Sequence, residues 1–231
     1  MEPRDFAWTH LKITGSTNDY AKERVRKREV SGFGAVYADL QTAGRGRGGN
    51  PWHSDNDKGL WVTLYFTDVA WNPFDAVMRA SLSVAESLGL FGLDCAIKWP
   101  NDVIAGRKKI CGILAETFDG NIVIGIGVNL RQSAADFPES IRESATSLLL
   151  ETGAPAGNEE FLDSLLSCFC ELEDPEENFR KYSGRLGILN AGMEIGGEEI
   201  RIKGVERDGA LLGENKSGRI KKYYSGNLRW I

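Results

Sequence analysis

The sequence predicts an α+β fold, in which a mixed β-sheet flanked by helices is followed by a small all-β unit. Up to residue 188, apolar segments of strand length alternate with helical patterns, as expected for a sheet covered by helices. Two of these segments flank Asp119-Gly120-Asn121, which has strong hairpin-turn chemistry. After Asn190, short strands alternate with glycine turns, as in a small barrel. We therefore expect one domain at 1–188 and a second at 189–231.

Composition narrows the class of protein. With 231 residues, of which 42% are hydrophobic, the chain can bury a sizeable core. Its 28 basic and 33 acidic residues give a net charge of −5, which argues against binding of nucleic acid or of an anionic membrane through overall charge. The longest apolar run, 122–128, is too short to span a bilayer, and 1–10 lacks the apolar core of a signal peptide. We expect a soluble, cytoplasmic protein.

The residue types that most often hold structural metals are sparse. The four cysteines form no C-x-x-C pair, and His10 and His53 are the only histidines. A structural zinc site is therefore not expected, and the cysteines are interpreted as buried free thiols.

The first elements are a strand at 8–13 and a charged, helix-favouring run at 19–27. Between them, Ser16-Thr17-Asn18 offers side chains that can cap the helix, and from the residues alone they either only cap it or also serve a site. Strands at 35–40 and 60–66 follow, and the first of them leads into Gln41 and a glycine-rich loop.

That loop, Gly44-Arg45-Gly46-Arg47-Gly48-Gly49, places two arginines among four glycines. Glycine lets the backbone expose N–H groups where a Cβ would block them, so the loop is typical of an anion-binding site. It is not a dinucleotide fingerprint, because residues 50–57 cannot begin the helix that this motif requires. Kinase and P-loop signatures are also missing.

Asn72-Pro73 predicts the start of a helix that runs to about residue 89. A strand at 95–99 follows and stops at Pro100, so Asn101 and Asp102 fall at a strand end, where polar side chains often enter a site. Lys98 and Lys109 bracket Asp102 in sequence. Chemistry that joins a carboxylate to a nucleotide phosphate needs such compensating cations, so we predict an enzyme that activates a carboxylic acid.

The remaining elements follow from periodicity. Strands at 110–118 and 122–130 are apolar and central, and 131–144 is expected to be a mobile loop. One helix is predicted with Asn158 as its N-cap, and another over about 177–186. Short strands of the second domain are predicted at 194–195, 198–205, 210–213, 220–224 and 228–231.

Several motifs, in this order, resemble those of biotin protein ligases. They are Ser16-Thr17-Asn18, Gln41-Thr42-Ala43-Gly44-Arg45-Gly46-Arg47-Gly48-Gly49, Lys98-Trp99-Pro100-Asn101-Asp102, Lys109-x-x-Gly112 and Gly125-Ile126-Gly127-Val128-Asn129. Asp208-Gly209-Ala210-Leu211-Leu212 and Gly226-x-Leu228-Arg229 also look like that family's terminal barrel, so the resemblance covers nearly the whole chain.

The resemblance implies a sheet related to the catalytic domains of class II aminoacyl-tRNA synthetases, followed by an SH3-like barrel. It also implies a two-step reaction. Biotin and MgATP give biotinyl-5'-AMP and pyrophosphate, and a lysine of a biotin carboxyl carrier protein domain then attacks the acyl carbon and releases AMP. Mg²⁺ enters with ATP, and no further metal is expected.

The resemblance also implies a set of site residues. The catalytic candidates are Lys109, Arg45, Arg47, Lys98 and Asp102. The biotin-binding candidates are Ser16, Thr17, Asn18, Gln41, Gly44, Arg45, Lys109 and Gly112. The nucleotide-binding candidates are Arg47, Trp52, Asn101, Asn129 and Arg229. Asp102 is expected to orient the acceptor lysine or to accept its proton, and the alternative is that it orients the metal.

One departure from the family pattern stands out: Gly15 occupies the place of an aspartate that usually precedes Ser-Thr. The alternatives are a lipoate or octanoate ligase of the same fold, which lacks the Gly-Arg-Gly-Arg motif, and a biotin-sensing regulator. Regulators of this family carry an N-terminal DNA-binding domain, for which the residues before Ser16 leave no room, so no DNA partner is expected. No membrane partner is expected either, and an exposed sheet edge is compatible with a homodimer.

Overall fold

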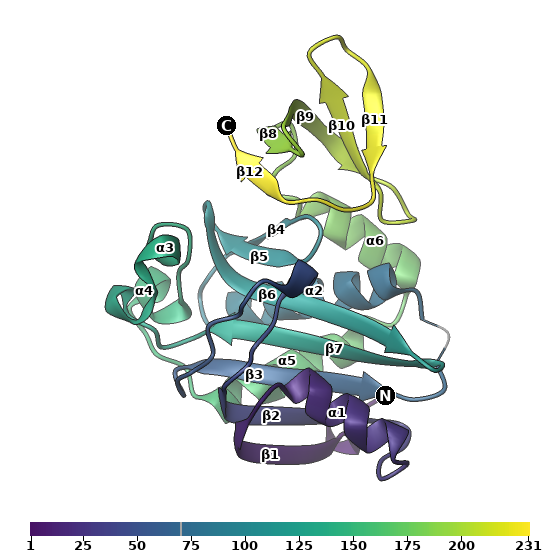
Figure 1. Cartoon of the computed structure of the whole chain (residues 1–231), viewed down its shortest axis with the longest axis vertical. Coiled ribbons are helices and arrows are strands. Elements are labelled where there is room, and N and C mark those ends of the chain that lie inside the picture. Colours follow the sequence, from purple (N-terminus) through teal and green to yellow (C-terminus); the bar gives the residue numbers. More distant parts are fainter. Residues whose placement is uncertain (70) are drawn as a thin grey trace.

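Two β-sheets and six α-helices make up the computed structural model, which describes residues 1–69 and 71–231 (Figure 1). The strands are β1 (Ala7–Thr14), β2 (Phe33–Gln41), β3 (Gly59–Phe66), β4 (Ala96–Lys98), β5 (Asp102–Ala105), β6 (Lys108–Phe118), β7 (Asn121–Asn129), β8 (Gly192–Ile195), β9 (Glu198–Val205), β10 (Leu211–Asn215), β11 (Ile220–Tyr223) and β12 (Leu228–Trp230). The helices are α1 (Thr17–Arg26), α2 (Pro73–Leu90), α3 (Glu139–Arg142), α4 (Leu148–Thr152), α5 (Asn158–Glu171) and α6 (Pro175–Gly184), with 3-10 turns η1 (Pro3–Asp5), η2 (Arg47–Gly49) and η3 (Ala134–Asp136).

The larger sheet has seven strands in the order β1-β2-β3-β7-β6-β5-β4. β1 and β2 are parallel and the other neighbours are antiparallel, so the sheet is mixed, as predicted. The predicted hairpin joins β6 to β7, and Asp119 and Gly120 both have positive φ, which is the conformation that this turn requires. This hairpin places β6 and β7 near the centre of the sheet.

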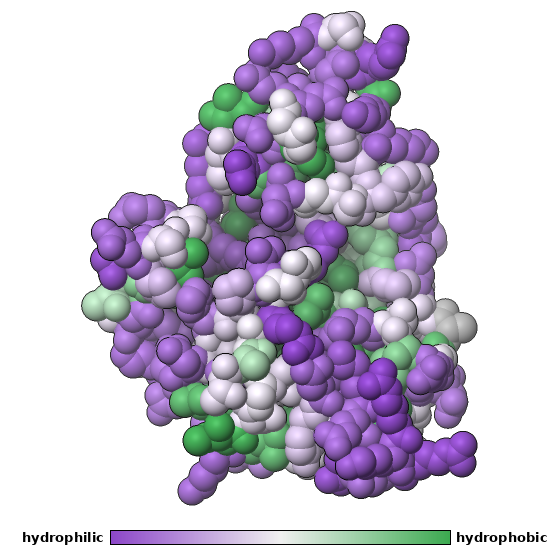
Figure 2. Space-filling view, in the orientation of Figure 1, coloured by the Kyte–Doolittle hydropathy of each residue, from purple (hydrophilic) through white to green (hydrophobic). Residues whose placement is uncertain are grey.

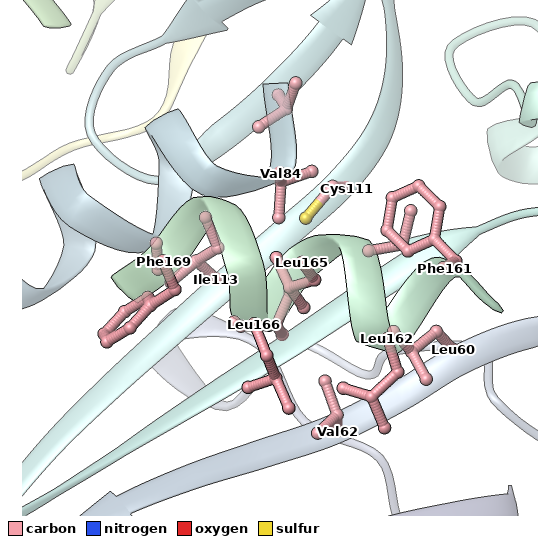
Figure 3. Close-up of a cluster of buried hydrophobic side chains, with 14 of the residues drawn as sticks. Leu60, Val62, Val84, Cys111, Ile113, Phe161, Leu162, Leu165, Leu166 and Phe169 are labelled. Carbon is pink, nitrogen blue, oxygen red and sulfur yellow. The ribbon is translucent and has the colours of Figure 1, made fainter. Parts of the chain in front are cut away.

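Helices cover both faces of this sheet (Figure 1). α2 and α5 pack on one face, and their apolar side chains form the main core with β3, β6 and β7 (Figure 3). α1 packs on the other face through Ala21 and Val25, which meet Val36, Tyr65 and Val123. These buried apolar contacts fix the helices on the sheet, so the loops that join the helices to the strands begin and end at fixed positions.

The smaller sheet has the order β11-β10-β9-β8-β12, with every neighbouring pair antiparallel. Its apolar side chains Met193, Ile200 and Leu211 share a core with Trp99 and Tyr182 of the larger unit. The predicted closed barrel is not found, because β11 and β12 do not pair with each other among the residues described.

Four further details differ from the sequence predictions. Asp102 begins a short strand, β5, that the sequence did not indicate, and Ser16 precedes α1 without a side-chain capping bond. Asn158 is the first residue of α5 rather than its cap. The segment 131–144 contains η3 and α3. Its expected mobility stays a prediction.

The four cysteines are free and buried, as predicted. Among the residues described, no helix combines the length and the apolar character that a membrane crossing requires.

Candidate active site

A cavity of about 590 Å³ opens where the glycine loop, β6, β7 and the C-terminal strands meet. Among the residues that line it are nearly all the predicted ones: Ser16, Thr17, Asn18, Gln41, Arg45, Arg47, Trp52, Lys98, Asn101, Asp102, Lys109, Gly112 and Arg229. The molecular face seen in Figure 2 is mostly hydrophilic, with small hydrophobic areas between the polar ones. A concave cavity into which several polar side chains converge is a common place for a small-molecule site.

Two predicted residues do not line the cavity. Gly44 lies behind it, where its carbonyl accepts a hydrogen bond from Trp52 N–H at 2.9 Å. A Cβ at Gly44 would come within 2.3 Å of Ser54 Oγ, so glycine is needed there to let the loop fold back on itself. Asn129 is buried and its amide donates to Thr146 O at 2.9 Å. We interpret both as structural supports of the site.

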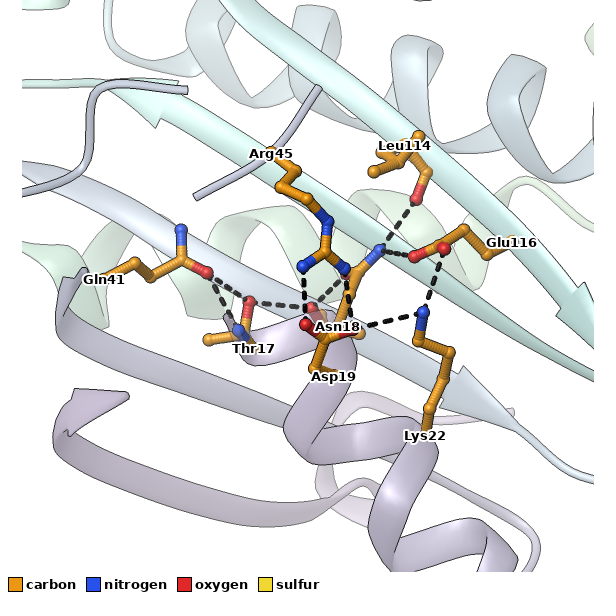
Figure 4. A network of polar contacts seen from close by, with 9 residues as sticks. Thr17, Asn18, Asp19, Lys22, Gln41, Arg45, Leu114 and Glu116 are labelled. Atoms are coloured by element: carbon orange, nitrogen blue, oxygen red, sulfur yellow. Dashed lines mark hydrogen bonds and ion pairs between the residues drawn. The ribbon is translucent and has the colours of Figure 1, made fainter. Parts of the chain in front are cut away.

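Neutral polar side chains form one end of the cavity, which we call the buried end: Thr17, Asn18 and Gln41 line it (Figure 4), and the fully buried Thr63 supports them through hydrogen bonds. Gln41 Oε1 accepts from the backbone N–H of Thr17 at 2.8 Å. Thr63, from the middle of β3, lies 2.6 Å from Asn18 Oδ1 and 2.8 Å from Thr17 Oγ1. Because each of these groups is already hydrogen-bonded, their orientations are fixed before any ligand arrives.

Glycines on β6 and β7 make room for this arrangement. A Cβ at Gly125 would lie 2.4 Å from Asn18 Oδ1, and one at Gly127 would lie 2.4 Å from Trp52 Nε1. At Gly112 it would lie 3.0 Å from the Lys109 side chain. The sheet therefore lacks side chains at Gly112 of β6 and at Gly125 and Gly127 of β7, where Lys109, Asn18 and Trp52 lie close to the strands.

Charged side chains form the other end of the cavity, which we call the charged end (Arg47, Lys98, Asp102 and Lys109). Lys109 Nζ lies 2.6 Å from Asp102 Oδ1, and the irregular β5–β6 pairing brings the two residues together from adjacent strands. The ammonium also lies 5.3 Å from the centre of the Trp52 ring, within cation–π range.

Burial lowers the pKa of Lys98, Asp102 acts against this effect, and Lys109 adds to it. A lowered pKa means that Lys98 holds its proton less tightly than a solvent-exposed lysine does. Arg47 Nη1 donates to Asn101 Oδ1 at 3.4 Å, which is a weak contact. Arg229 reaches the cavity from β12, so the C-terminal sheet completes this end of the site.

The pairing of the cations differs from the simplest expectation. Arg45 and Lys109 are both engaged by carboxylates, Asp19 and Asp102 respectively. Among the described ion pairs, Arg47, Lys98 and Arg229 have no carboxylate partner. Within the cavity lining, these three side chains therefore carry positive charge that no described ion pair offsets.

Sequence reasoning missed Thr63, Asp19 and Glu116. Thr63 had a signal, since it is the one small polar residue in the strand Gly59–Phe66, all of which is buried. Asp19 and Glu116 had none, because the contact of both with Lys22 depends on how α1 and β6 lie relative to each other in the fold.

Comparison with known protein families agrees with the resemblance seen in the motifs. A family model described as "Biotin/lipoate A/B protein ligase family" matches residues 11–132, which is more than half of the chain. This chain belongs to the biotin/lipoate A/B protein ligase family.

Relatives within this ligase family match over most of the chain. The bifunctional ligase/repressor BirA of Bacillus subtilis is 30% identical over 240 residues, covering 94% of this chain and 71% of the relative. The biotin--[acetyl-CoA-carboxylase] ligase of Paracoccus denitrificans is 31% identical over 238 residues, covering 90% of this chain and 95% of the relative.

The solved structure of biotin protein ligase from Aquifex aeolicus in complex with biotin and ATP superimposes with a TM-score of 0.84 at 29% identity. The match covers 97% of this chain and 99% of the other. The resemblance read from the motifs is thus confirmed at the level of the ligase family and of its fold.

Proposed function

We propose that this chain is an ATP-dependent biotin protein ligase that activates biotin as biotinyl-5'-AMP and transfers it to a lysine of a biotin carboxyl carrier protein. The observation that carries the proposal is one cavity whose two ends differ. The side chains at one end are neutral and already hydrogen-bonded to one another, and those at the other end are charged. A ligand with a neutral polar ring at one end and a carboxylate at the other fits this division. The relatives that are named biotin ligases support the same assignment.

The buried end suits the ureido ring of biotin. Ser16, Thr17 and Gln41 offer hydroxyl and amide groups, and Gly112 leaves backbone within reach. Neutral donors and acceptors of fixed orientation recognise a neutral cyclic urea without having to desolvate an ion.

The charged end suits the reacting groups. A carboxylate oxygen of biotin attacks the α-phosphorus of ATP, and the bond to pyrophosphate breaks as pyrophosphate leaves with the electron pair. The carboxylate and the phosphate repel each other as they approach, so Lys109, Arg45 and Arg47 would stabilise the charge that develops between them. Trp52, Asn101 and Arg229 would contact the nucleotide.

Mg²⁺ would reach the site on the phosphates of ATP. Among the described residues no group of three or more metal-binding side chains is found, and Asp102 is the one carboxylate in the cavity lining. This donor set fits an ion held mainly by phosphate oxygens, with at most one protein carboxylate. When bound, such an ion neutralises phosphate charge.

In the second step the neutral amine of the acceptor lysine attacks the acyl carbon, the bond to AMP breaks, and AMP leaves. We propose that Asp102 orients this amine and accepts its proton. The carboxylate of Asp102 is only partly buried and its partner Lys109 holds it at the charged end, 2.6 Å from the ammonium. A base must lie within hydrogen-bond reach of the amine it serves, and the proposal is supported by Asp102 being the one carboxylate among the described residues that line the cavity.

We also propose the division into a catalytic domain at 1–188 and a C-terminal domain at 189–231 of SH3-like type. The five-stranded antiparallel sheet supports this, although its ends do not pair. The free outer edge of β1 supports the proposal of a homodimer, and we expect neither DNA nor a membrane to be a partner.

Pyrophosphate release tests the function. Purified protein is incubated with MgATP and either biotin, lipoate or octanoate, and a carrier domain is then added with radiolabelled acid. Biotin-dependent pyrophosphate release followed by label on the carrier lysine is the expected result. Release with lipoate or octanoate alone would favour the alternative ligases of this fold, and biotin binding without release would leave only a binding protein.

A further inference from the structure

Arg45 is held by a carboxylate that belongs to neither end of the cavity. Its Nη1 and Nη2 donate to the two oxygens of Asp19, each at 2.6 Å. This is a bidentate pair, in which a planar guanidinium and a planar carboxylate fix each other's orientation. Asp19 lies in the first turn of α1, whereas Arg45 comes from the glycine loop, so the pair ties the loop to the helix.

This geometry leaves part of Arg45 available. A guanidinium has five N–H groups, and Asp19 takes one from each terminal nitrogen. The edge that contains Nε remains, and Arg45 lines the cavity while the pair is formed. One arginine can therefore be gripped by Asp19 and still offer a second edge to a ligand oxyanion.

Asp19 is itself anchored. Its carboxylate lies 3.2 Å from Lys22 Nζ, which lies 2.9 Å from Glu116 Oε1. Glu116 in turn accepts from Asn18 Nδ2 at 2.8 Å, and Asn18 belongs to the buried end (Figure 4). The series of contacts thus runs from Arg45 to Asn18 at the buried end of the cavity.

We propose that Asp19 is a positioning residue for the adenylation step, which holds Arg45 so that its free edge faces the carboxylate and α-phosphate of the bound substrates. The proposal rests on the proposed function. The four charged side chains in this series of contacts, Arg45, Asp19, Lys22 and Glu116, alternate in sign and cancel. Arg45 therefore contributes through the orientation of its guanidinium more than through added net charge.

A plain surface ion pair is the competing interpretation. The side chains of Arg45 and Asp19 are 38% and 49% exposed, and pairs with such exposure contribute little to stability. The hydrogen bond from Arg45 lowers the pKa of the Asp19 carboxyl, so Asp19 is ionised in both interpretations. The two interpretations predict different results when Asp19 is substituted. A positioning residue would change the rate of adenylation, whereas a plain surface ion pair would not.

The test compares Asp19→Asn with Glu23→Gln in the full chain. Glu23 lies one turn further along α1, pairs with Lys27 at 2.6 Å and does not line the cavity, so its substitution removes the same charge and a similar pair. Biotin-dependent pyrophosphate release is measured at varied biotin and ATP. We expect kcat to fall about tenfold in Asp19→Asn, with a smaller change in KM for biotin because the buried end is intact, and to stay within about twofold in Glu23→Gln.

A double-mutant cycle with Arg45→Lys identifies the route of the effect. If Asp19 acts through Arg45, then Asp19→Asn adds little to Arg45→Lys, because the bidentate pair is already lost. Asp19→Glu, which keeps the carboxylate, is expected to recover part of the rate. Thermal unfolding checks that each variant folds, and Asp19→Ser, which suits the first turn of a helix, replaces Asp19→Asn if that variant unfolds.

Two results would overturn the proposal: a kcat for Asp19→Asn within about twofold of wild type, or a loss that adds in full to that of Arg45→Lys. Wild-type protein that releases no pyrophosphate with biotin would instead refute the proposed function. The two failures are therefore distinguishable in one assay.

Discussion

At the buried end of the cavity the polar side chains are neutral and hidden from water, whereas at the charged end they are ionised and partly exposed. Thr17, Asn18, Gln41 and Thr63 are each less than a tenth exposed and hydrogen-bonded to one another. Lys109 and Asp102 retain 35% and 22% of their side-chain exposure. The same cavity thus holds a rigid recognition surface beside an adaptable set of charges.

The difference follows from the cost of burying charge. Neutral groups can be buried if each one finds a partner, and the sheet supplies those partners at fixed positions. Ions need either water or a counter-ion, and a site that receives anionic substrates must exchange one counter-ion for another. We therefore expect substitutions at the charged end to act on chemistry and those at the buried end to act on stability and affinity together.

The largest effect is expected from Lys109→Ala. Loss of a cation at the developing charge should reduce adenylate formation about 100- to 1000-fold, or about 2.7–4 kcal/mol, with little change in stability. Lys108→Ala, which removes the exposed neighbouring lysine, is the matched control. Pyrophosphate release within about tenfold of wild type would show that Lys109 is a structural residue.

Next comes Thr63→Val, which replaces the hydroxyl of a fully buried residue by a methyl group of similar size. It leaves Asn18 Oδ1 without its 2.6 Å partner, so we expect the free energy of unfolding to fall by about 1–3 kcal/mol and biotin affinity to fall with it. Chemical denaturation and biotin titration measure the two effects. Thr117→Val, on an exposed part of β6, should change neither, and equal effects in both variants would remove the distinction between the two ends.

A smaller effect is expected from Gly127→Ala. The added Cβ would lie 2.4 Å from Trp52 Nε1 and would displace this ring from the sheet. If Trp52 contacts the nucleotide, KM for ATP should rise about tenfold while biotin affinity changes less, since a displaced side chain costs about 1–3 kcal/mol. The control is Gly89→Ala, where no heavy atom lies within 4 Å of the new Cβ. An unchanged KM for ATP would separate Trp52 from the nucleotide.

The smallest expected effect is a response to acid near the charged end. Hydrogen bonds from Lys58 and Ser133 lower the pKa of Asp136 from 3.8 to about 2. The same bonds hold the start of the segment that contributes Ile141 and Ser144 to the cavity lining. Because this folded-state pKa is depressed, the stabilisation is present above about pH 4 and is lost as the pH falls towards 2.

The free energy of unfolding, measured between about pH 5 and about pH 2, checks this prediction, because this range includes both the ordinary pKa of Asp136 and its lowered pKa. Asp136→Asn should show a weaker dependence on pH over this window than wild type. Identical curves for the two proteins would mean that Asp136 does not contribute to acid unfolding.

The sequence by itself determined much of this protein. Strand and helix positions followed from the spacing of apolar residues, and the 119–121 turn followed from Asp-Gly-Asn chemistry, because both signals are local. The glycine loop and the Lys98–Asp102 segment were also visible, since an anion site needs particular residue types close together in the chain. Here local pattern and final structure agree.

Only the tertiary structure decided which charges meet. Asp102 pairs with Lys109 because β5, which the sequence did not indicate, lies beside β6 with an irregular register. Asp19 meets Arg45 because α1 lies across the face of the sheet and its first turn comes beside the glycine loop. A Coulombic contact depends on distance in space, and residues that lie far apart in the chain acquire that distance only when helices and strands pack.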